Sequence, residues 1–245
     1  MRALSLFTGY GGIDLALKEY ITEVVAYVEI EEYAQKIIAY RMAEGSLRTA
    51  PILADVKNVK GDIGACDIIY GGFPCQDLSV AGNGKGLEGE RSGLFYEVIR
   101  LTKEIRPSFV FLENVPAIRT RGLDQVIKEF TEMGYDCRWT MLSAESVGAC
   151  HKRERWFLLA HNRCERGQGI GQEQIQGKRT LQRSKNVGRD QNFHRRPDLY
   201  EPKLCRSLHD VTFGMDRIKA IGNGVVPLQV KTAFEKLIGM GHTFL

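Results

Sequence analysis

Short apolar runs alternate with longer amphipathic ones through the first 160 residues, and this alternation constrains the fold more than any other feature. The short runs have the length of buried strands, and the longer runs carry apolar residues at helical spacing. Strands that alternate with helices in this way predict an α/β fold with a mostly parallel sheet. The predicted strands span residues 3–7, 24–28, 68–70 and 109–112, and the predicted helices span residues 13–20, 34–42, 94–105 and 123–133.

The rest of the chain completes this sheet. Residues 136–142 and 156–160 are rich in strand-forming residues and predict an antiparallel edge. Residues 228–238 have helical apolar spacing and are predicted to pack back onto the first domain. We therefore divide the chain into a main domain over residues 1–160, a short basic segment over 161–206 and a returning C-terminal segment over 207–245.

Positive charge is concentrated in one segment. Residues 161–206 hold 11 Lys or Arg and 5 Asp or Glu, a net charge of +6 in a chain whose net charge is +4. The stretch from 168 to 196 is rich in Gln and poor in large apolar residues. Such a composition fits a lobe that faces a polyanion or a disordered loop, and it leaves both interpretations open.

The cysteines and the hydropathy pattern predict an intracellular protein without a metal site. The six cysteines form no Cys-x2-4-Cys pair, which predicts reduced thiols and no metal site. The apolar run at the N-terminus is short for a signal peptide, and no stretch approaches the roughly 18 apolar residues of a membrane span. We expect a soluble, cytoplasmic protein that needs no membrane.

A turn after the third predicted strand presents a cysteine. Gly71-Gly72-Phe73-Pro74-Cys75-Gln76 follows the apolar run at residues 67–70. Glycine permits a sharp turn, and Pro74 fixes its own φ, so Cys75 is predicted to be held as a nucleophile. A lone cysteine is more often a small buried hydrophobe, so this interpretation depends on the rest of the chain.

Three segments at strand ends are candidates for cofactor binding. Phe7-Thr8-Gly9-Tyr10-Gly11-Gly12 follows the first strand and opens a helix, where backbone amides can meet a carboxylate or phosphate. A tight strand-to-helix turn is the plainer alternative. Glu29 ends the second strand, where a ribose diol is commonly bound, and Asp55 ends the next apolar stretch, where it could meet an adenine amine. Both acids could instead be helix caps.

An acid and two arginines complete the candidate site. Glu113 ends the strand at 109–112 and is expected at the same sheet edge as Cys75, a pairing that favours covalent chemistry on a ring. Arg153 and Arg155 are predicted to alternate onto one strand face, where they could contact phosphate and orient a carboxylate. A capping or ion-paired acid and a solvated basic edge strand are the alternatives. The turn at Gly222-Asn223-Gly224 has no function on its own.

Taken in order, these segments resemble the DNA cytosine-5 methyltransferase family, over nearly the whole chain outside the basic segment. The matching segments are Phe7 to Gly12, Phe73-Pro74-Cys75-Gln76, Glu113-Asn114-Val115, Arg153-x-Arg155 and Gly222-Asn223. The resemblance implies a Rossmann-like methyltransferase sheet with a small target-recognition lobe. It also implies S-adenosyl-L-methionine as cofactor, S-adenosyl-L-homocysteine as product and double-stranded DNA as substrate.

The resemblance further implies a role for each matching residue. The expected cofactor contacts are Phe7, Gly9, Gly11, Gly12, Glu29, Asp55, Val56, Pro74, Leu94, Asn223 and Val225. The residues expected around a flipped cytosine are Cys75, Glu113, Arg153 and Arg155. A glycine-rich basic loop over residues 77–93 would close over DNA, as the corresponding loop does in the family. We expect a monomer, with a cognate restriction enzyme as a partner of the restriction-modification type.

The chain departs from the family pattern in three places. His151 stands where the family usually has Gln, and Ala149-Cys150 stands where a Pro is common. The variable segment after residue 160 is short, so we expect slight sequence selectivity or recognition by another chain. Two other functions remain open at this point: methylation of cytosine in tRNA, and a catalytically silent DNA-binding subunit.

Overall fold

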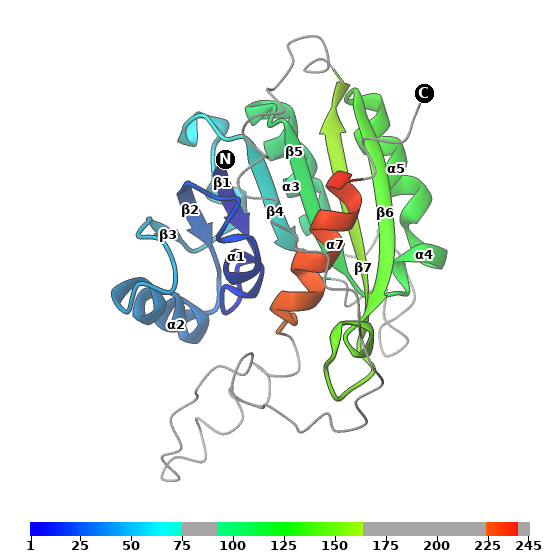
Figure 1. Ribbon diagram of the computed structural model, residues 1–245. Coiled ribbons are helices and arrows are strands. Elements are labelled where there is room, and N and C mark those ends of the chain that lie inside the picture. The colour runs from blue at the N-terminus through cyan, green and yellow to red at the C-terminus, as the bar shows by residue number, and fades with distance from the viewer. Residues whose placement is uncertain (75–92, 164–223, 240–245) are drawn as a thin grey trace.

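A computed structural model describes residues 1–74, 93–163 and 224–239 of the chain (Figure 1). These residues form a seven-stranded sheet in the order β3-β2-β1-β4-β5-β7-β6. The first five strands in this order are parallel, whereas β7 is antiparallel to both β5 and β6. The mostly parallel sheet with an antiparallel edge is therefore confirmed. The strands are β1 (Arg2–Leu6), β2 (Glu23–Val28), β3 (Ile52–Leu53), β4 (Ile68–Gly72), β5 (Phe109–Asn114), β6 (Tyr135–Ser143) and β7 (Glu154–Asn162).

Helices cover both faces of the sheet. One face packs against α1 and α7, and the other packs against α3 and α5 (Figure 1). The helices described are α1 (Gly12–Leu17), α2 (Glu32–Ala43), α3 (Leu94–Ile105), α4 (Ile118–Arg121), α5 (Leu123–Glu132) and α7 (Pro227–Gly239), with short 3-10 turns η1 (Val56–Asn58), η2 (Gly61–Ile63) and η4 (Glu145–Val147).

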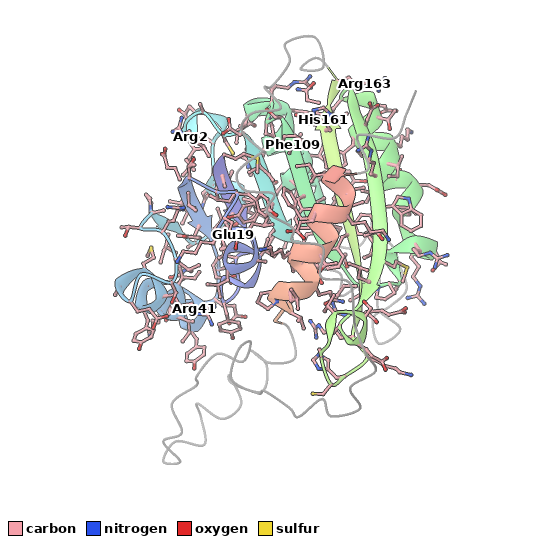
Figure 2. The ribbon with its side chains drawn as sticks, in the orientation of Figure 1. Arg2, Glu19, Arg41, Phe109, His161 and Arg163 are labelled. Carbon is pink, nitrogen blue, oxygen red and sulfur yellow. The ribbon has the colours of Figure 1, made fainter. Side chains whose placement is uncertain are left out.

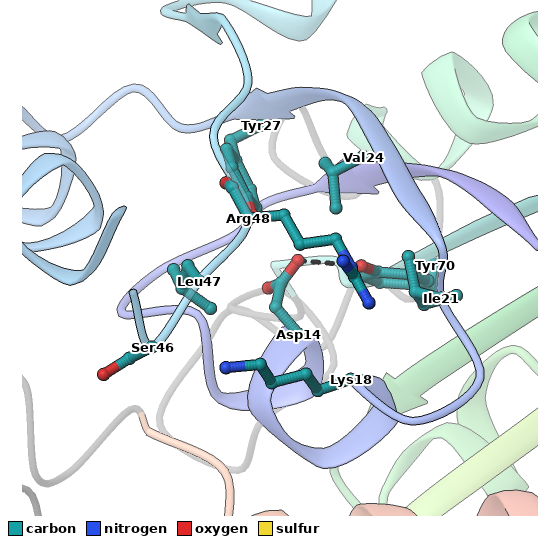
Figure 3. Close-up of a pocket in the computed structure, with 9 residues that line it drawn as sticks. All are labelled: Asp14, Lys18, Ile21, Val24, Tyr27, Ser46, Leu47, Arg48 and Tyr70. Carbon is teal, nitrogen blue, oxygen red and sulfur yellow. Dashed lines mark hydrogen bonds between the residues drawn. The ribbon is translucent and has the colours of Figure 1, made fainter. Parts of the chain in front are cut away.

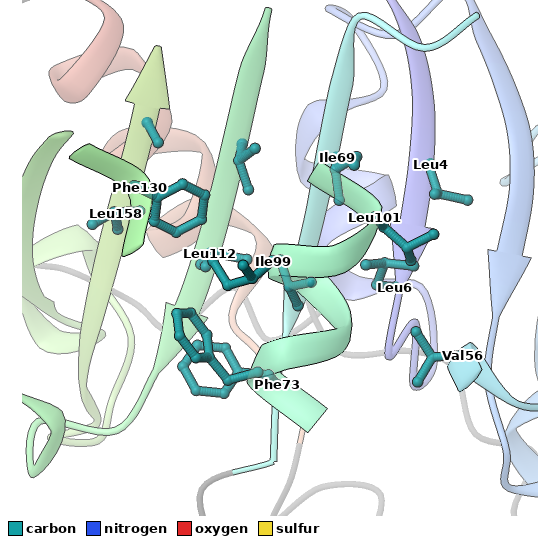
Figure 4. Close-up of a cluster of buried hydrophobic side chains, with 14 of the residues drawn as sticks. Leu4, Leu6, Val56, Ile69, Phe73, Ile99, Leu101, Leu112, Phe130 and Leu158 are labelled. Atoms are coloured by element: carbon teal, nitrogen blue, oxygen red, sulfur yellow. The ribbon is translucent and has the colours of Figure 1, made fainter. Parts of the chain in front are cut away.

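Each face of the sheet has its own hydrophobic core. Successive residues of a strand point to opposite faces, so Leu112 belongs to the core under α3 and α5, and Phe111 to the core under α1 and α7. Figure 4 shows the first of these cores, in which Phe73 and Ile99 also lie. Burial on both faces explains why the parallel strands read as continuous apolar runs.

Several element boundaries differ from the sequence prediction. β1 ends at Leu6, because Phe7 has a φ of 51° and leaves the strand conformation. α1 ends at Leu17, three residues before the predicted end. Arg153 lies one residue before β7, so it is outside the strand that was predicted to carry it, although both Arg153 and Arg155 interact with Glu113. The two-residue β3 and the four-residue α4 are too short for periodicity to reveal.

Most of the proposed recognition segment, residues 164–206, lies outside the described residues, as do residues 207–223 of the returning C-terminal segment. The predicted helix in that segment is present as α7, and it packs on α1, β6 and β7. No helix among the described residues has the length and apolar character needed to cross a membrane.

Candidate active site

The candidate site lies at the carboxyl edge of the parallel strands. β1 is flanked by β2 on one side and β4 on the other, so the direction in which the strand order grows reverses beside it. Ligands of open α/β sheets bind beyond the carboxyl ends of the strands at such a point. The loops that leave β1, β2, β4 and β5 carry the predicted residues, and the structure therefore brings these segments to one edge.

The loop after β1 is held by Glu29. Gly9 and Gly11 have φ values of 55° and 74°, a left-handed conformation that suits glycine. The backbone NH of Gly9 donates to Oε2 of Glu29 at 2.6 Å, and the NH of Glu31 donates to Oε1 at 2.9 Å. Glu29 is thus a buried carboxylate that joins the ends of β1 and β2, next to a turn rich in backbone amides.

The segment before α7 packs against the same loop. A Cβ atom on Gly12 would lie 2.6 Å from Cγ2 of Val225, so only glycine permits this approach. Val225 and Gly12 are adjacent in space although more than 200 residues separate them. Leu94 begins α3 and packs against the core beneath the edge, and Pro74 is half-buried at the end of β4.

Asp55 has a structural contact. Its Oδ1 accepts a hydrogen bond from the backbone NH of Lys57 at 2.9 Å, so the carboxylate caps η1. This is the helix-cap role that the sequence left open for Asp55. Val56 is buried in the core of the α3 face. Contacts of Asp55 and Val56 with a cofactor stay predictions.

Glu113 and Arg155 form the charged centre of the other half of the site. Nε of Arg155 lies 2.8 Å from Oε1 of Glu113, and the two side chains are 16% and 11% exposed. Burial raises the pKa of Glu113 above its ordinary value, and the charges of Arg155 and Arg153 offset part of this effect. Burial and the like charge of Arg155 lower the pKa of Arg153. The structure thus brings Glu113, Arg153 and Arg155 together.

Two residues that the sequence analysis left without a role shape the turn leading to Cys75. Gly72 is paired with Glu113 across β4 and β5, and a Cβ atom on Gly72 would lie 2.6 Å from Oε2 of Glu113. Nδ2 of Asn114 donates to the carbonyl of Phe73 at 3.2 Å. Gly72 lies beside the Cys75 motif in the sequence, and Asn114 lies beside Glu113. This adjacency was the only sequence signal for either residue.

A buried polar network lies behind the β1 loop. Asp14 accepts hydrogen bonds from the hydroxyls of Tyr70 at 2.8 Å and Ser5 at 3.2 Å, and Ser5 is bonded to Thr8 at 3.0 Å. Burial is the main cause that raises the pKa of Asp14 to about 6. Figure 3 shows Asp14 and Tyr70 in the wall of a small cavity beside the basic side chain of Arg48. Asp14 had no sequence signal, because it sits inside an amphipathic helix.

Two further features flank the loop. Ile30 follows Glu29 directly and its side chain is 69% exposed, which leaves an apolar surface at the site edge. Nη1 of Arg41, labelled in Figure 2, donates to the carbonyl of Tyr10 and so ties α2 to the β1 loop. Neither the exposure of Ile30 nor the bond of Arg41 was predicted, because both depend on how α2 packs.

Other predicted site features lie outside the described residues. These are Cys75, Asn223 and nearly all of the loop at 77–93. Within the described ranges, no group of three or more His, Cys, Asp or Glu side chains is arranged to hold a metal ion.

Comparison with known proteins identifies the family. The family model for C-5 cytosine-specific DNA methylase matches residues 1–203. The type II methyltransferase M.CviJI of Paramecium bursaria Chlorella virus IL3A is 43% identical over 160 residues, which cover 65% of this chain and 42% of that protein. M.HhaI of Haemophilus parahaemolyticus is 33% identical over 163 residues, which cover 65% of this chain and 48% of that protein.

A solved structure agrees in fold. The S. pombe Dnmt2 methyltransferase superposes with a TM-score of 0.53 at 22% identity, over 66% of this chain and 49% of that chain. The chain spans about half the length of the relatives that it matches. With its family model covering most of its residues, the chain belongs to the C-5 cytosine-specific DNA methylase family.

Proposed function

We propose that the protein transfers a methyl group from S-adenosyl-L-methionine to C5 of a cytosine flipped out of double-stranded DNA, through a covalent bond between Cys75 and C6. The buried pair of Glu113 and Arg155 is the observation that carries this proposal. Glu113 lies on β5, next to β4, whose carboxyl end leads into Cys75, and Arg155 lies on β7, on the other side of β5. Membership of the methylase family and the names of the relatives support the same reaction.

The loop after β1 and the end of β2 fit the cofactor. Gly9 and Gly11 give the β1 loop a left-handed turn, and Glu29, which accepts the NH of Gly9, offers a carboxylate suited to a ribose diol. Val225 and Leu94 would line the apolar part of the pocket. When bound, S-adenosyl-L-methionine supplies an electrophilic methyl group on a sulfonium ion. The exposed side chain of Ile30 would cover one side of the adenine.

The chemistry assigned to the chain starts from an unreactive ring carbon. Addition of the Cys75 thiolate to C6 forms an S–C6 bond and moves the C5–C6 π electrons into an enamine, which makes C5 nucleophilic. Glu113, whose pKa is raised by burial, would donate a proton or hydrogen bond to N3 as charge builds on the ring. Arg155 would hold Glu113 in place and contact the base O2. Once C5 carries the methyl group, loss of the C5 proton restores the C5–C6 double bond and breaks the bond between Cys75 and C6.

The target cytosine is stacked inside duplex DNA, so the nucleotide must swing out at a cost of a few kcal/mol. The basic segment at 161–206 would supply contacts to phosphate, and its short length predicts slight selectivity or a separate recognition chain. The named relatives are DNA-modifying type II enzymes, which favours DNA over tRNA and allows a restriction enzyme as partner. We propose a monomer that acts on one strand at a time.

Transfer of tritium from labelled S-adenosyl-L-methionine to mixed-sequence duplex DNA tests this function, with a parallel assay on tRNA. Bisulfite sequencing of the DNA should show protected cytosines in one short context. Incorporation into tRNA alone would reject the DNA substrate. No incorporation into either, with cofactor binding confirmed, would point to a silent subunit or a missing recognition chain.

The covalent step has its own test. Cys75→Ser and Cys75→Ala should abolish transfer and leave cofactor binding intact, whereas Cys150→Ser, at an exposed thiol, should retain activity. Wild-type protein should form a stable adduct with DNA that contains 5-fluorocytosine, because fluorine cannot leave as a proton does. Full activity of Cys75→Ala would remove the covalent bond from the mechanism.

A further inference from the structure

Gln229 is a fully buried polar residue on an otherwise apolar helix face. It lies in the first turn of α7, and the other buried residues of that helix are Val230, Ala233, Phe234 and Leu237. Its Nε2 donates two hydrogen bonds of 2.8 Å, one to the carbonyl of Leu142 in β6 and one to the carbonyl of Arg153 just before β7. One side-chain amide therefore joins a helix to the two antiparallel strands.

Both carbonyls belong to residues close to Arg155. Leu142 is the register partner of Arg155 across β6 and β7, and Arg153 precedes it by two residues. Arg155 in turn makes the 2.8 Å ion pair with Glu113. The amide of Gln229 thus restrains the backbone from which both arginines reach toward Glu113.

The hydrogen bonds that Gln229 donates, and not its packing, explain why a glutamine occupies this buried position of α7. No donor among the described residues reaches Oε1 of Gln229, although the atom is buried. Burying an amide oxygen without a partner is unfavourable, and an apolar side chain of the same length would avoid that cost. The benefit of glutamine is therefore the pair of donated bonds to Leu142 and Arg153.

The same helix is also connected to the cofactor side. Val225, in the segment leading into α7, packs against Gly12, and the NH of Val230 bonds to the carbonyl of Val226 at 3.1 Å. α7 thus spans from the β1 loop to the arginine segment. We propose that Gln229 is a positioning residue that holds Arg153 and Arg155 against Glu113 and so lets α7 couple the cofactor loop to the base-binding side.

The mechanistic meaning of this inference depends on the proposed function, but its test does not require turnover. Gln229→Met keeps the length of the side chain and removes both donors. Thr232→Val is the matched control, because Thr232 bonds only within α7, to the carbonyl of Leu228. A carbon-13 NMR titration of the Glu113 carboxyl, assigned by its loss in Glu113→Gln, reports directly on the arginines. Methyl transfer under single-turnover conditions and cofactor affinity are measured beside it.

We expect Gln229→Met to raise the pKa of Glu113, because less well placed arginines stabilise the carboxylate less. The methyl-transfer rate should fall about tenfold through misplacement of the pair, with cofactor affinity within about twofold. Thr232→Val should change neither quantity. An unchanged Glu113 titration in a Gln229→Met variant that only melts earlier would overturn the proposal. If the wild-type protein methylates no nucleic acid, the proposed function fails while the titration still decides the role of Gln229.

Discussion

Nε of Arg155 lies 2.8 Å from Oε1 of Glu113, and both side chains are almost fully enclosed by the sheet edge. Desolvation raises the pKa of Glu113, while Arg155 and Arg153 lower it in part. Burial and the two arginines therefore have opposite effects on the pKa of Glu113, and the arginines limit the rise that burial causes. A group balanced in this way suits the exchange of a proton with a ring nitrogen.

Arg155→Met should raise the pKa of Glu113 further and lower the methyl-transfer rate by about a hundredfold, because the acid loses its nearest cation and its fixed orientation. NMR titration of the carboxyl and single-turnover rates measure the two effects. The matched control is Arg2→Met, which breaks the surface ion pair between Arg2, at the start of β1, and Glu23 (Figure 2). A Glu113 pKa that stays unchanged in Arg155→Met would show that the pair does not set the acidity.

Gly72→Ala should slow methyl transfer roughly tenfold or more while cofactor affinity stays unchanged. The new Cβ atom would lie 2.6 Å from Oε2 of Glu113, so the carboxylate must move. Gly239→Ala is the control, since a Cβ atom there meets nothing within 4 Å. Equal rates in the two variants would mean that the position of the Glu113 carboxylate does not limit the reaction.

Gly12→Ala should weaken binding of S-adenosyl-L-methionine by roughly tenfold, because its Cβ atom would lie 2.6 Å from Cγ2 of Val225. Alanine suits a helix start as well as glycine does, so the effect should be purely steric. Adding Val225→Ala removes the clashing methyl group and should restore most of the affinity. Calorimetric titration of the single and double variants measures this coupling, and additive losses would argue against contact between the two segments.

Asp14→Asn should make the protein more stable than wild type near neutral pH but not in acid. The pKa of Asp14 is about 6 in the folded protein against an ordinary value of 3.8, so folding favours the protonated acid. This contribution to stability is complete below pH 3.8 and is lost as the pH rises through 6. The difference between the variants should therefore grow by about 3 kcal/mol across this window.

Urea unfolding at pH 4 and pH 7 tests the Asp14 prediction, with Asp62→Asn at an exposed position of η2 as the control. The Oδ1 of asparagine keeps the acceptor for Tyr70, while its Nδ2 replaces an acceptor by a donor and can bond to Ser5 only with the direction of that hydrogen bond reversed. The same free-energy difference at both pH values would show that folding does not raise the pKa of Asp14.

Local patterns determined the fold class and the order of the candidate motifs. The spacing of apolar residues and the length of each run predicted the strands and most helices, because buried residues recur every second residue in a strand and about every 3.6 residues in a helix. Cys75 and Glu113 could be assigned to one edge, because the carboxyl ends of neighbouring parallel strands share an edge, whereas the Arg153-x-Arg155 pattern was assigned to the site only through the family resemblance. These inferences need only the spacing of residues along the chain.

Tertiary structure alone decided which of those residues touch. The clearance between Gly72 and Glu113, the contact of Gly12 with Val225 and the two bonds of Gln229 join residues from 41 to 213 positions apart. No local pattern encodes such contacts, because they arise from the register of β4 on β5 and from the packing of α7 on the sheet. The raised pKa values of Asp14 and Glu113 have the same origin, since burial is set by the folded chain and not by neighbours in sequence.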